Sequence, residues 1–329
     1  MQRKQRGVAL IVVLLVVAII AVLAVSISGR NQVSVRRTIN MAEYDQAYWY
    51  AISAEELARK VLKQDLDDAE GRVHLQQYWA LSNAVFPAEV GQIGGTISDL
   101  RSCFNLNSLS QTSTTNKNTQ VETLPVAAKQ YKALLEDIGI DEFNAERLMY
   151  TLKDYLDADT DIGTYGAEDD DYEARKVPYR AANTLMSDRS ELRAVLGYSQ
   201  EIYRKLLPYV CVIPGNNTQV LNVNTVKVEQ AALLAAMLEN KISVGEAESI
   251  INQRASSGFD KVDDFWQQGS LASIASQDDQ MKSSFAVSSK FFMLDGRAKV
   301  DDAVFHMQSV LHVIGGNKLE VLTRQYGGQ

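Results

Sequence analysis

Residues 1–25 read MQRKQRGVALIVVLLVVAIIAVLAV, and this stretch decides how the chain is built. Three basic residues within the first seven precede 18 consecutive uncharged apolar residues, 8–25. At about 1.5 Å per residue, an apolar helix of this length spans roughly 27 Å, close to the thickness of a bilayer's hydrocarbon core. The basic cluster is expected to stay in the cytoplasm, so that everything after the helix lies beyond the membrane. We therefore predict one transmembrane helix over residues 8–30.

The helix is predicted to continue far beyond the membrane. A cleaved signal peptide has the same order of charges and apolar core, but a break should follow that core. Here the first proline is Pro87, and from Ala47 to Leu66 the apolar residues recur with helical spacing. The simplest interpretation is one continuous helix over roughly residues 8–66, apolar all round in its first half and amphipathic in its second.

The composition of the 329 residues excludes several kinds of protein. A net charge of −8 argues against nucleic acid as the main partner. The two cysteines, Cys103 and Cys211, are too few for a disulfide-dense scaffold or a cysteine-based zinc site. The three histidines are scattered and do not share a helix face as metal ligands would. The charged and apolar fractions are those of a folded protein.

The rest of the chain separates into a helical middle and a strand-rich end. Helical patterns at 127–138, 143–156, 187–196, 201–209, 228–240 and 243–254 predict an α-domain. Residues 91–100 favour a turn and a strand, and two hairpins are predicted near the end, around Asp295-Gly296 and around 315–317. These strands would form an antiparallel sheet against the amphipathic half of the long helix. We therefore predict an α+β fold divided as 1–7, 8–30, 31–104, 105–280 and 281–329, in which 105–280 is an inserted α-domain.

A short repeat lies inside the α-domain. Asn105-Leu106-Asn107-Ser108 is echoed by Asn222-Val223-Asn224-Thr225, and each copy leads into two helices, in the first copy after a polar loop at 110–120. Ser108 and Thr225 are predicted N-caps of those helices. The pattern is similar to helix-hairpin-helix modules that bind DNA. The turn at 239–242 has no glycine, however, and its surroundings are acidic, which disfavours phosphate binding.

The strongest chemical signal is an acidic run between residues 154 and 173, which contains nine carboxylates and no Lys or Arg. Such a run should repel itself into disorder unless a cation neutralises it. The alternating carboxylates of Asp157, Asp159 and Asp161, followed by Gly163 and Gly166, suit a hard cation that takes about six to eight oxygen ligands, so we predict calcium. Two alternatives stay open: a solvated acidic loop and a glycosidase-like pair of carboxylates.

The N-terminus resembles that of type IV pilin-like proteins, in which a short basic leader ends in glycine and the apolar helix begins at once. Gly7 followed by Val8 matches this pattern. The resemblance implies that a prepilin peptidase cleaves between them and that Val8 becomes an N-methylated terminus. Most such subunits carry Glu at the fifth mature position, where this chain has Val12.

A more specific resemblance covers nearly the whole chain. The stretch 155–197, with its GAED, PYR and SELR strings, and the two asparagine repeats are similar to the minor pseudopilin K family of type II secretion systems. The resemblance implies a pilin-like fold, a long N-terminal helix packed on an antiparallel sheet, with a large inserted α-helical domain that binds calcium. It also implies a non-enzymatic, single-pass inner-membrane protein, mostly periplasmic, at the pseudopilus tip with minor pseudopilins I and J.

The resemblance sets the expected role and the candidate ligands. The role is to initiate pseudopilus assembly and so to support secretion across the outer membrane, with no nucleic acid or small-molecule substrate. The strings do not fix which carboxylates hold the ion; the expected ligands are Asp159, Asp161, Glu168, Asp169 and Asp171. The alternative is a membrane-tethered periplasmic calcium-binding module. A tethered DNA-uptake protein would need a basic surface, and a tethered hydrolase a nucleophile–base pair, and the sequence indicates neither.

Cys103 and Cys211 are both expected beyond the membrane, where thiols oxidise. Each lies upstream of one asparagine repeat, although this spacing does not by itself bring the two together. We predict a disulfide between them. It would close a loop of about 100 residues, which is worth up to roughly 4–5 kcal/mol in the chain-entropy model.

Overall fold

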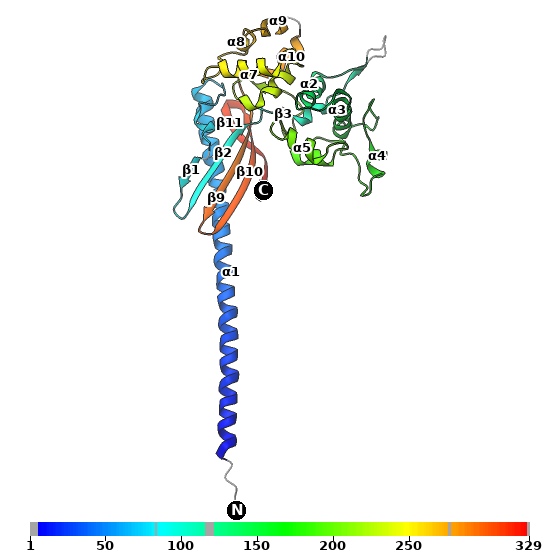
Figure 1. Cartoon of the computed structure of the whole chain (residues 1–329). Coiled ribbons are helices and arrows are strands. Elements are labelled where there is room, and N and C mark those ends of the chain that lie inside the picture. Colours follow the sequence, from blue (N-terminus) through cyan, green and yellow to red (C-terminus); the bar gives the residue numbers. More distant parts are fainter. Residues whose placement is uncertain (1–5, 83, 116–121, 276–277, 328–329) are drawn as a thin grey trace, which may run out of the picture.

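The computed structural model describes residues 6–82, 84–115, 122–275 and 278–327. Its dominant element is α1 (Arg6–Asp68), one unbroken helix of 63 residues that runs from the N-terminus into the folded head (Figure 1). Every residue from 7 to 42 is exposed, and the apolar part is long enough to cross a membrane. The predicted continuous helix is confirmed, while residues 1–5 of the expected leader lie outside the described part.

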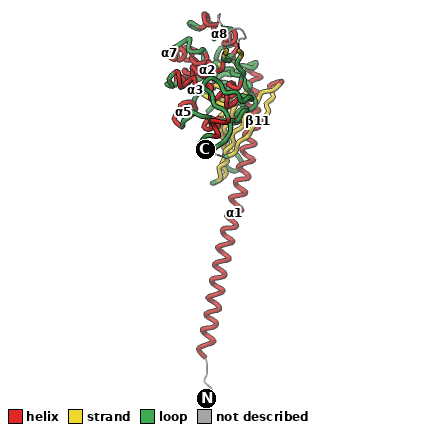
Figure 2. The backbone as a smooth tube through the Cα atoms, turned by 90° about the vertical axis from the view of Figure 1, so that its right-hand side faces the viewer, coloured by secondary structure: helices red, strands yellow, loops and turns green. Residues whose placement is uncertain are grey.

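The second half of α1 packs on a five-stranded antiparallel sheet, and Figure 2 shows the strands lying alongside the upper part of the helix. The strand order is β1-β2-β9-β10-β11. Two strands therefore come from the segment directly after α1 and three from the C-terminal end of the chain. The strands are β1 (Ala84–Pro87), β2 (Gln92–Asp99), β9 (Phe291–Val300), β10 (Ala303–Ile314) and β11 (Lys318–Tyr326).

Small residues of α1 contact the sheet first along the chain, and larger residues follow. Ala47 and Ala51 pack with Phe305 and Met307 in one buried cluster, so the absence of bulk on the helix lets large sheet residues approach it. About two to four turns further on, Ala58, Leu62 and Leu66 form a second cluster with strand residues such as Phe292 and Leu311. The amphipathic stripe predicted from residue 47 onward is this buried face.

The first predicted C-terminal hairpin is wrong. Asp295 and Gly296 lie inside β9, and the chain turns instead between β9 and β10, where Asp301 has a φ of 47°. Gly296 is paired with Gly95 of β2. A Cβ on Gly95 would lie 2.6 Å from the Asp295 carbonyl oxygen and 3.2 Å from the Gly296 Cα, so the glycines permit close strand approach rather than a turn. The second predicted hairpin, around 315–317, is confirmed between β10 and β11.

The helical region (residues 104–285) has its own large core, built from buried residues between Phe104 and Phe285. Most predicted helices are present, but the segment expected to be helical at 187–196 is a 3₁₀ turn, Arg189–Ala194. The α-helices are α2 (Val126–Asp137), α3 (Glu142–Leu156), α4 (Asp169–Glu173), α5 (Gln200–Leu206), α6 (Ala231–Met237), α7 (Val244–Gln253), α8 (Val262–Trp266), α9 (Leu271–Ala275) and α10 (Asp279–Ser283). The short strands are β3 (Phe104–Asn105), β4 (Thr114–Thr115), β5 (Glu122–Thr123), β6 (Val210–Cys211), β7 (Leu221–Asn222) and β8 (Phe285–Ala286).

The two asparagine repeats make equivalent hydrogen bonds to distant segments of the chain. Asn107 accepts from the Met186 backbone N–H at 2.8 Å and donates to its carbonyl at 2.9 Å. Asn224 does the same to Phe259, at 2.7 and 3.0 Å. Each buried amide thus ties down a segment distant in sequence, which satisfies its donor and acceptor together.

The predicted N-caps, Ser108 and Thr225, are wrong, because their hydroxyls bond within the repeats instead of to the start of a helix. Ser108 lies inside a 3₁₀ turn, and its hydroxyl donates back to the Asn105 carbonyl, as the Thr225 hydroxyl does to Asn222. Thr225 also donates to the buried carboxylate of Asp99, at the end of β2, at 2.7 Å. The second repeat therefore joins the helical region to the sheet.

Candidate functional site

The acidic loop (residues 157–168) joins α3 to α4 and brings three carboxylates together. One oxygen each from Asp157, Asp159 and Glu168 lies within 4.8 Å of the other two. Asp157 is the C-cap residue of α3, and Glu168 is the N-cap residue of α4, so two helix ends place two of the three groups. Asp157 and Glu168 are only 4% and 3% exposed, while Asp159 faces solvent. This spacing is suited to a shared hard cation.

The course of the loop depends on a fourth carboxylate behind it. The backbone N–H of Gly163 donates to Asp154 at 2.9 Å, and the loop wraps so closely that a Cβ on Gly166 would lie 1.7 Å from the same carboxylate. Both glycines are therefore required for close approach. Burial of the Asp154 carboxylate raises its pKa to about 6.

The acidic loop leaves buried oxygens without partners. Among the described residues, neither carboxylate oxygen of Glu168 accepts a hydrogen bond of good geometry, and neither does Oδ1 of Asp157. Burial, and then repulsion from Asp154, raises the pKa of Glu168 to about 7. Buried carboxylate oxygens are normally satisfied, so the unpartnered oxygens fit a bound cation.

Two of the five expected ligands, Asp159 and Glu168, belong to this group, and the structure adds Asp157. The alternation 157/159/161 had already marked Asp157 in the sequence. The other three lie outside the group. Asp161 donates its backbone N–H to Asp159, Asp169 accepts from the Ala181 backbone and approaches Arg180, and Asp171 accepts from the Glu168 backbone.

Tyrosine rings support the loop from the core side. The ring of Tyr172 lies 5.6 Å from that of Tyr155 and 5.3 Å from that of Tyr179. Tyr179 donates its hydroxyl to the Ala194 carbonyl at 2.5 Å, which fixes the segment after α4. Tyr165 packs on Phe143 instead. The row of rings gives the acidic loop a rigid apolar base.

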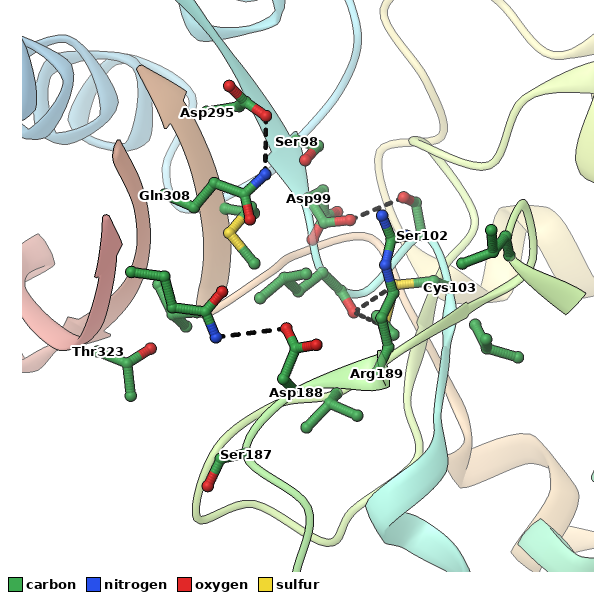
Figure 3. A pocket seen from close by; sticks show the side chains of 18 of the residues that line it. Ser98, Asp99, Ser102, Cys103, Ser187, Asp188, Arg189, Asp295, Gln308 and Thr323 are labelled. Carbon is green, nitrogen blue, oxygen red and sulfur yellow. Dashed lines mark hydrogen bonds between the residues drawn. A yellow bond between two sulfur atoms is a disulfide. The ribbon is translucent and has the colours of Figure 1, made fainter. Parts of the chain in front are cut away.

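A pocket of about 250 Å³ lies between the sheet and the helical region, beside Cys103 and Cys211 (Figure 3). The two cysteines are joined by a disulfide with 5.8 Å between their Cα atoms. Polar side chains that line the pocket pair with one another: Gln308 donates to Asp295 at 2.9 Å, and Gln325 donates to Asp188. Among the described residues that line it there is no histidine, so the pocket offers no histidine–nucleophile pair.

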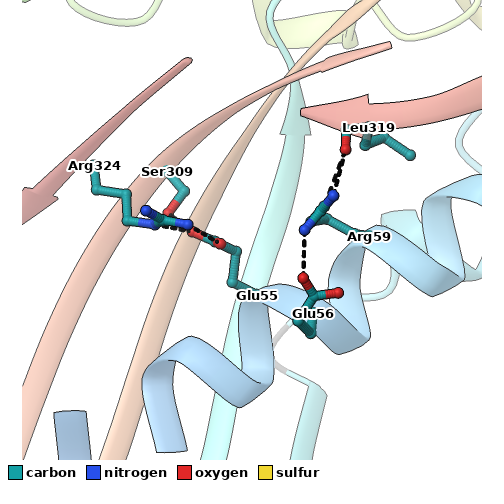
Figure 4. A network of polar contacts seen from close by, with 6 residues as sticks. All are labelled: Glu55, Glu56, Arg59, Ser309, Leu319 and Arg324. Carbon is teal, nitrogen blue, oxygen red and sulfur yellow. Dashed lines mark hydrogen bonds and ion pairs between the residues drawn. The ribbon is translucent and has the colours of Figure 1, made fainter. Parts of the chain in front are cut away.

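A further buried carboxylate lies between α1 and the sheet, and sequence reasoning missed it. Glu55, 1% exposed, accepts two hydrogen bonds from Arg324 of β11, both at 2.8 Å, and one from Ser309 of β10 at 2.6 Å (Figure 4). Burial acts to raise the pKa of Glu55, but these donors outweigh it and hold the pKa below its ordinary value. The pair locks the helix to the last strand.

Comparison with known proteins gives one consistent result. Sequence models described as "Type II secretion system (T2SS), protein K" match residues 102–215 and 221–288. The chain is 38% identical to type II secretion system protein K of Pectobacterium carotovorum subsp. carotovorum, over 100% of this chain and 98% of the relative. It is 39% identical to that of Aeromonas hydrophila, over 99% and 98%.

The fold agrees with the sequence match. One chain of the crystal structure of the GspK–GspI–GspJ complex from enterotoxigenic Escherichia coli superposes with a TM-score of 0.78 at 35% identity, covering 89% of this chain and 100% of that one. The long helix on an antiparallel sheet, with a helical region inserted between its early and late strands, is thus shared by both. The chain belongs to the type II secretion system protein K family, a family of structural, non-enzymatic minor pseudopilins.

Proposed function

We propose that this minor pseudopilin caps the secretion pseudopilus, initiates its assembly and thereby supports secretion across the outer membrane, with minor pseudopilins I and J as partners. The observation that carries the proposal is the likeness to a chain of the GspK–GspI–GspJ complex. The alternative, a tethered calcium-binding module, would share the acidic loop but would need no pilin partners.

Two features of this chain support a terminal position. Val12 carries no charge with which to answer the N-terminus of a subunit above it, in an apolar filament core where charges are costly. The helical region also sits at the end of the sheet farthest from the N-terminus (Figure 1), where it would obstruct the addition of a further subunit.

Three experiments test the partners and the terminal position. The full chain in detergent should co-purify with pseudopilins I and J of its own system, and immunogold labelling should mark one end of each pseudopilus. Val12→Glu should alter assembly little, because the helical region still obstructs addition. Gold along the whole filament, or purification without either partner, would contradict the proposal.

We further propose that α1 anchors the chain in the inner membrane, that the bulk of the chain is periplasmic, and that prepilin peptidase cleaves after Gly7. The supporting observation is an exposed apolar helix that continues directly from Gly7 and is long enough to cross a membrane. N-terminal sequencing of the membrane form should start at an N-methylated Val8. A start at Met1, or beyond Val25, would refute the processing.

The acidic loop is proposed to bind calcium through Asp157, Asp159 and Glu168. The unpartnered buried oxygens of Asp157 and Glu168 support this assignment. Calcium would offset the carboxylate repulsion and so order the connection between α3 and α4. The Cys103–Cys211 disulfide is proposed to persist in the envelope, where thiol counting on unfolded, unreduced protein should find no free thiols.

A further inference from the structure

We propose that Lys153 is a built-in counter-ion of the acidic loop, which holds the metal-free loop together and weakens its affinity for a divalent cation. The second half of this inference rests on the proposed calcium site. Lys153 lies in the last turn of α3, four residues before Asp157, and its ammonium lies 2.9 Å from Oδ2 of Asp157.

The burial of this ion pair sets it apart from ordinary surface pairs. The side chains of Lys153 and Asp157 are 11% and 5% exposed. By contrast, the lysines of the Lys63–Asp67 and Lys205–Glu201 pairs are 46% and 44% exposed. A lysine is rarely buried unless a carboxylate compensates its charge, because desolvation of the ammonium is costly. Here the compensating charge belongs to the acidic loop.

The position of Lys153 divides the oxygens of Asp157 between two cations. Oδ2 accepts from the ammonium, while Oδ1 is buried without a partner and belongs to the same side chain that faces Asp159 and Glu168. The ammonium therefore leaves one oxygen of Asp157 available to a metal.

The ammonium offsets part of the negative charge of the group. With all three carboxylates ionised, as a bound cation would hold them, they carry three negative charges, and Lys153 reduces the total to two. Without the ammonium, the repulsion among the carboxylates of the metal-free loop would be larger, and a bound cation would feel no repulsion from a neighbouring positive charge. At separations of several ångströms inside a protein, one unit charge changes an equilibrium constant by about ten-fold or more. Lys153 thus lowers the affinity of the loop for a divalent cation and raises the stability of the metal-free loop.

The test uses the full chain in detergent micelles and calcium chloride as the probe. Lys153→Met keeps most of the length of the unbranched side chain and removes the charge. Titration calorimetry should show calcium binding about ten-fold tighter or more than in wild type. Melting in chelator should occur at a lower temperature than wild type, and the calcium-induced rise should be larger. Lys132→Met is the matched control, because Lys132 lies among three carboxylates elsewhere, Glu136, Glu142 and Glu146, and its loss should leave calcium affinity unchanged.

The outcomes separate this inference from the calcium proposal. If wild type binds calcium and Lys153→Met binds it with the same dissociation constant, the counter-ion role is overturned. If no variant binds calcium, the metal proposal fails. The melting temperatures of the metal-free variants then test the other part of the inference, that Lys153 holds the metal-free loop together. Lys153→Met/Asp157→Asn should then melt above Lys153→Met alone, because no unpaired charge is left buried. Equal melting of the two variants would overturn that part as well, and the double variant also serves if the single one does not fold.

Discussion

Glu55 and Glu168 are both buried carboxylates, and the difference between them shows what burial alone does not decide. Glu55, on helix α1, receives three hydrogen bonds from two strands of the sheet, and its pKa is held below the ordinary value. Glu168 receives none of good geometry within the described residues, and its pKa is raised to about 7. The chain itself satisfies the carboxylate of the first site, whereas the carboxylate oxygens of the second are left without partners. We expect the stability of the chain to depend on the partners of Glu55 when they are mutated, and on calcium at Glu168.

The largest expected effect is on stability, when the ion pair between Glu55 and Arg324 is removed. Arg324→Met leaves a buried carboxylate without its main partner and should lower the free energy of unfolding by about 3 kcal/mol. Arg59→Met is the control at the same helix–sheet interface, because Arg59 donates to the Leu319 carbonyl rather than to a buried carboxylate; its cost should be about 1 kcal/mol (Figure 4). Denaturant titration of the full chain measures both. Equal costs would remove the distinction between the sites.

The second effect concerns calcium at the acidic loop. At about 100 times its dissociation constant, calcium should stabilise the wild-type chain by about 2–3 kcal/mol, and chelator should reverse this. Glu168→Gln should abolish most of the gain. Asp170→Asn removes the same charge from an exposed position on α4 and should retain it. An equal loss in both variants would indicate a diffuse charge effect instead of a site.

The third prediction tests how closely the loop must wrap around Asp154. Gly166→Ala places a Cβ 1.7 Å from a carboxylate oxygen and should destabilise the chain by about 2 kcal/mol while weakening calcium binding. Gly245→Ala, in α7, has open space around the new methyl group and should be neutral or stabilising, because alanine favours a helix. Thermal melts with and without calcium distinguish the two.

The smallest effect is one of pH, and its sign differs between the sites. Glu168 has a folded pKa of about 7 against an ordinary 4.5, so the metal-free fold takes up a proton and gains stability as the pH falls through that window. Glu55, with a lowered pKa, contributes stability above pH 4.5 and loses it below. In chelator, lowering the pH from 7.5 to 5 should raise the melting temperature of wild type by about 2 °C relative to that of Glu168→Gln. No relative change would contradict the raised pKa.

Features encoded by neighbouring residues could be predicted from the sequence. The continuous helix follows from unbroken periodicity after Val25, and the acidic loop follows from alternate carboxylates with glycines behind them. Gly166 was expected to let the loop turn, and it does so by giving space to Asp154.

What escaped prediction depends on residues far apart in the chain. Glu55 meets Arg324 across 269 positions, and nothing near either residue marks the pair. Asp295-Gly296 has the composition of a turn, but the facing Gly95 of another strand keeps it extended. The asparagine repeats were visible, whereas their partners, Met186 and Phe259, were not, because hydrogen bonds of this kind are formed only by tertiary structure.

The Cys103–Cys211 bond has a consequence for how the protein withstands proteases of the cell envelope. The covalent ring between the two cysteines encloses the acidic loop, whose exposed middle (residues 158–162) is a segment that a protease can reach. A single cut there opens the ring but leaves both pieces attached. After limited digestion without calcium, the chain should therefore run as one band on a non-reducing gel and as two on a reducing gel.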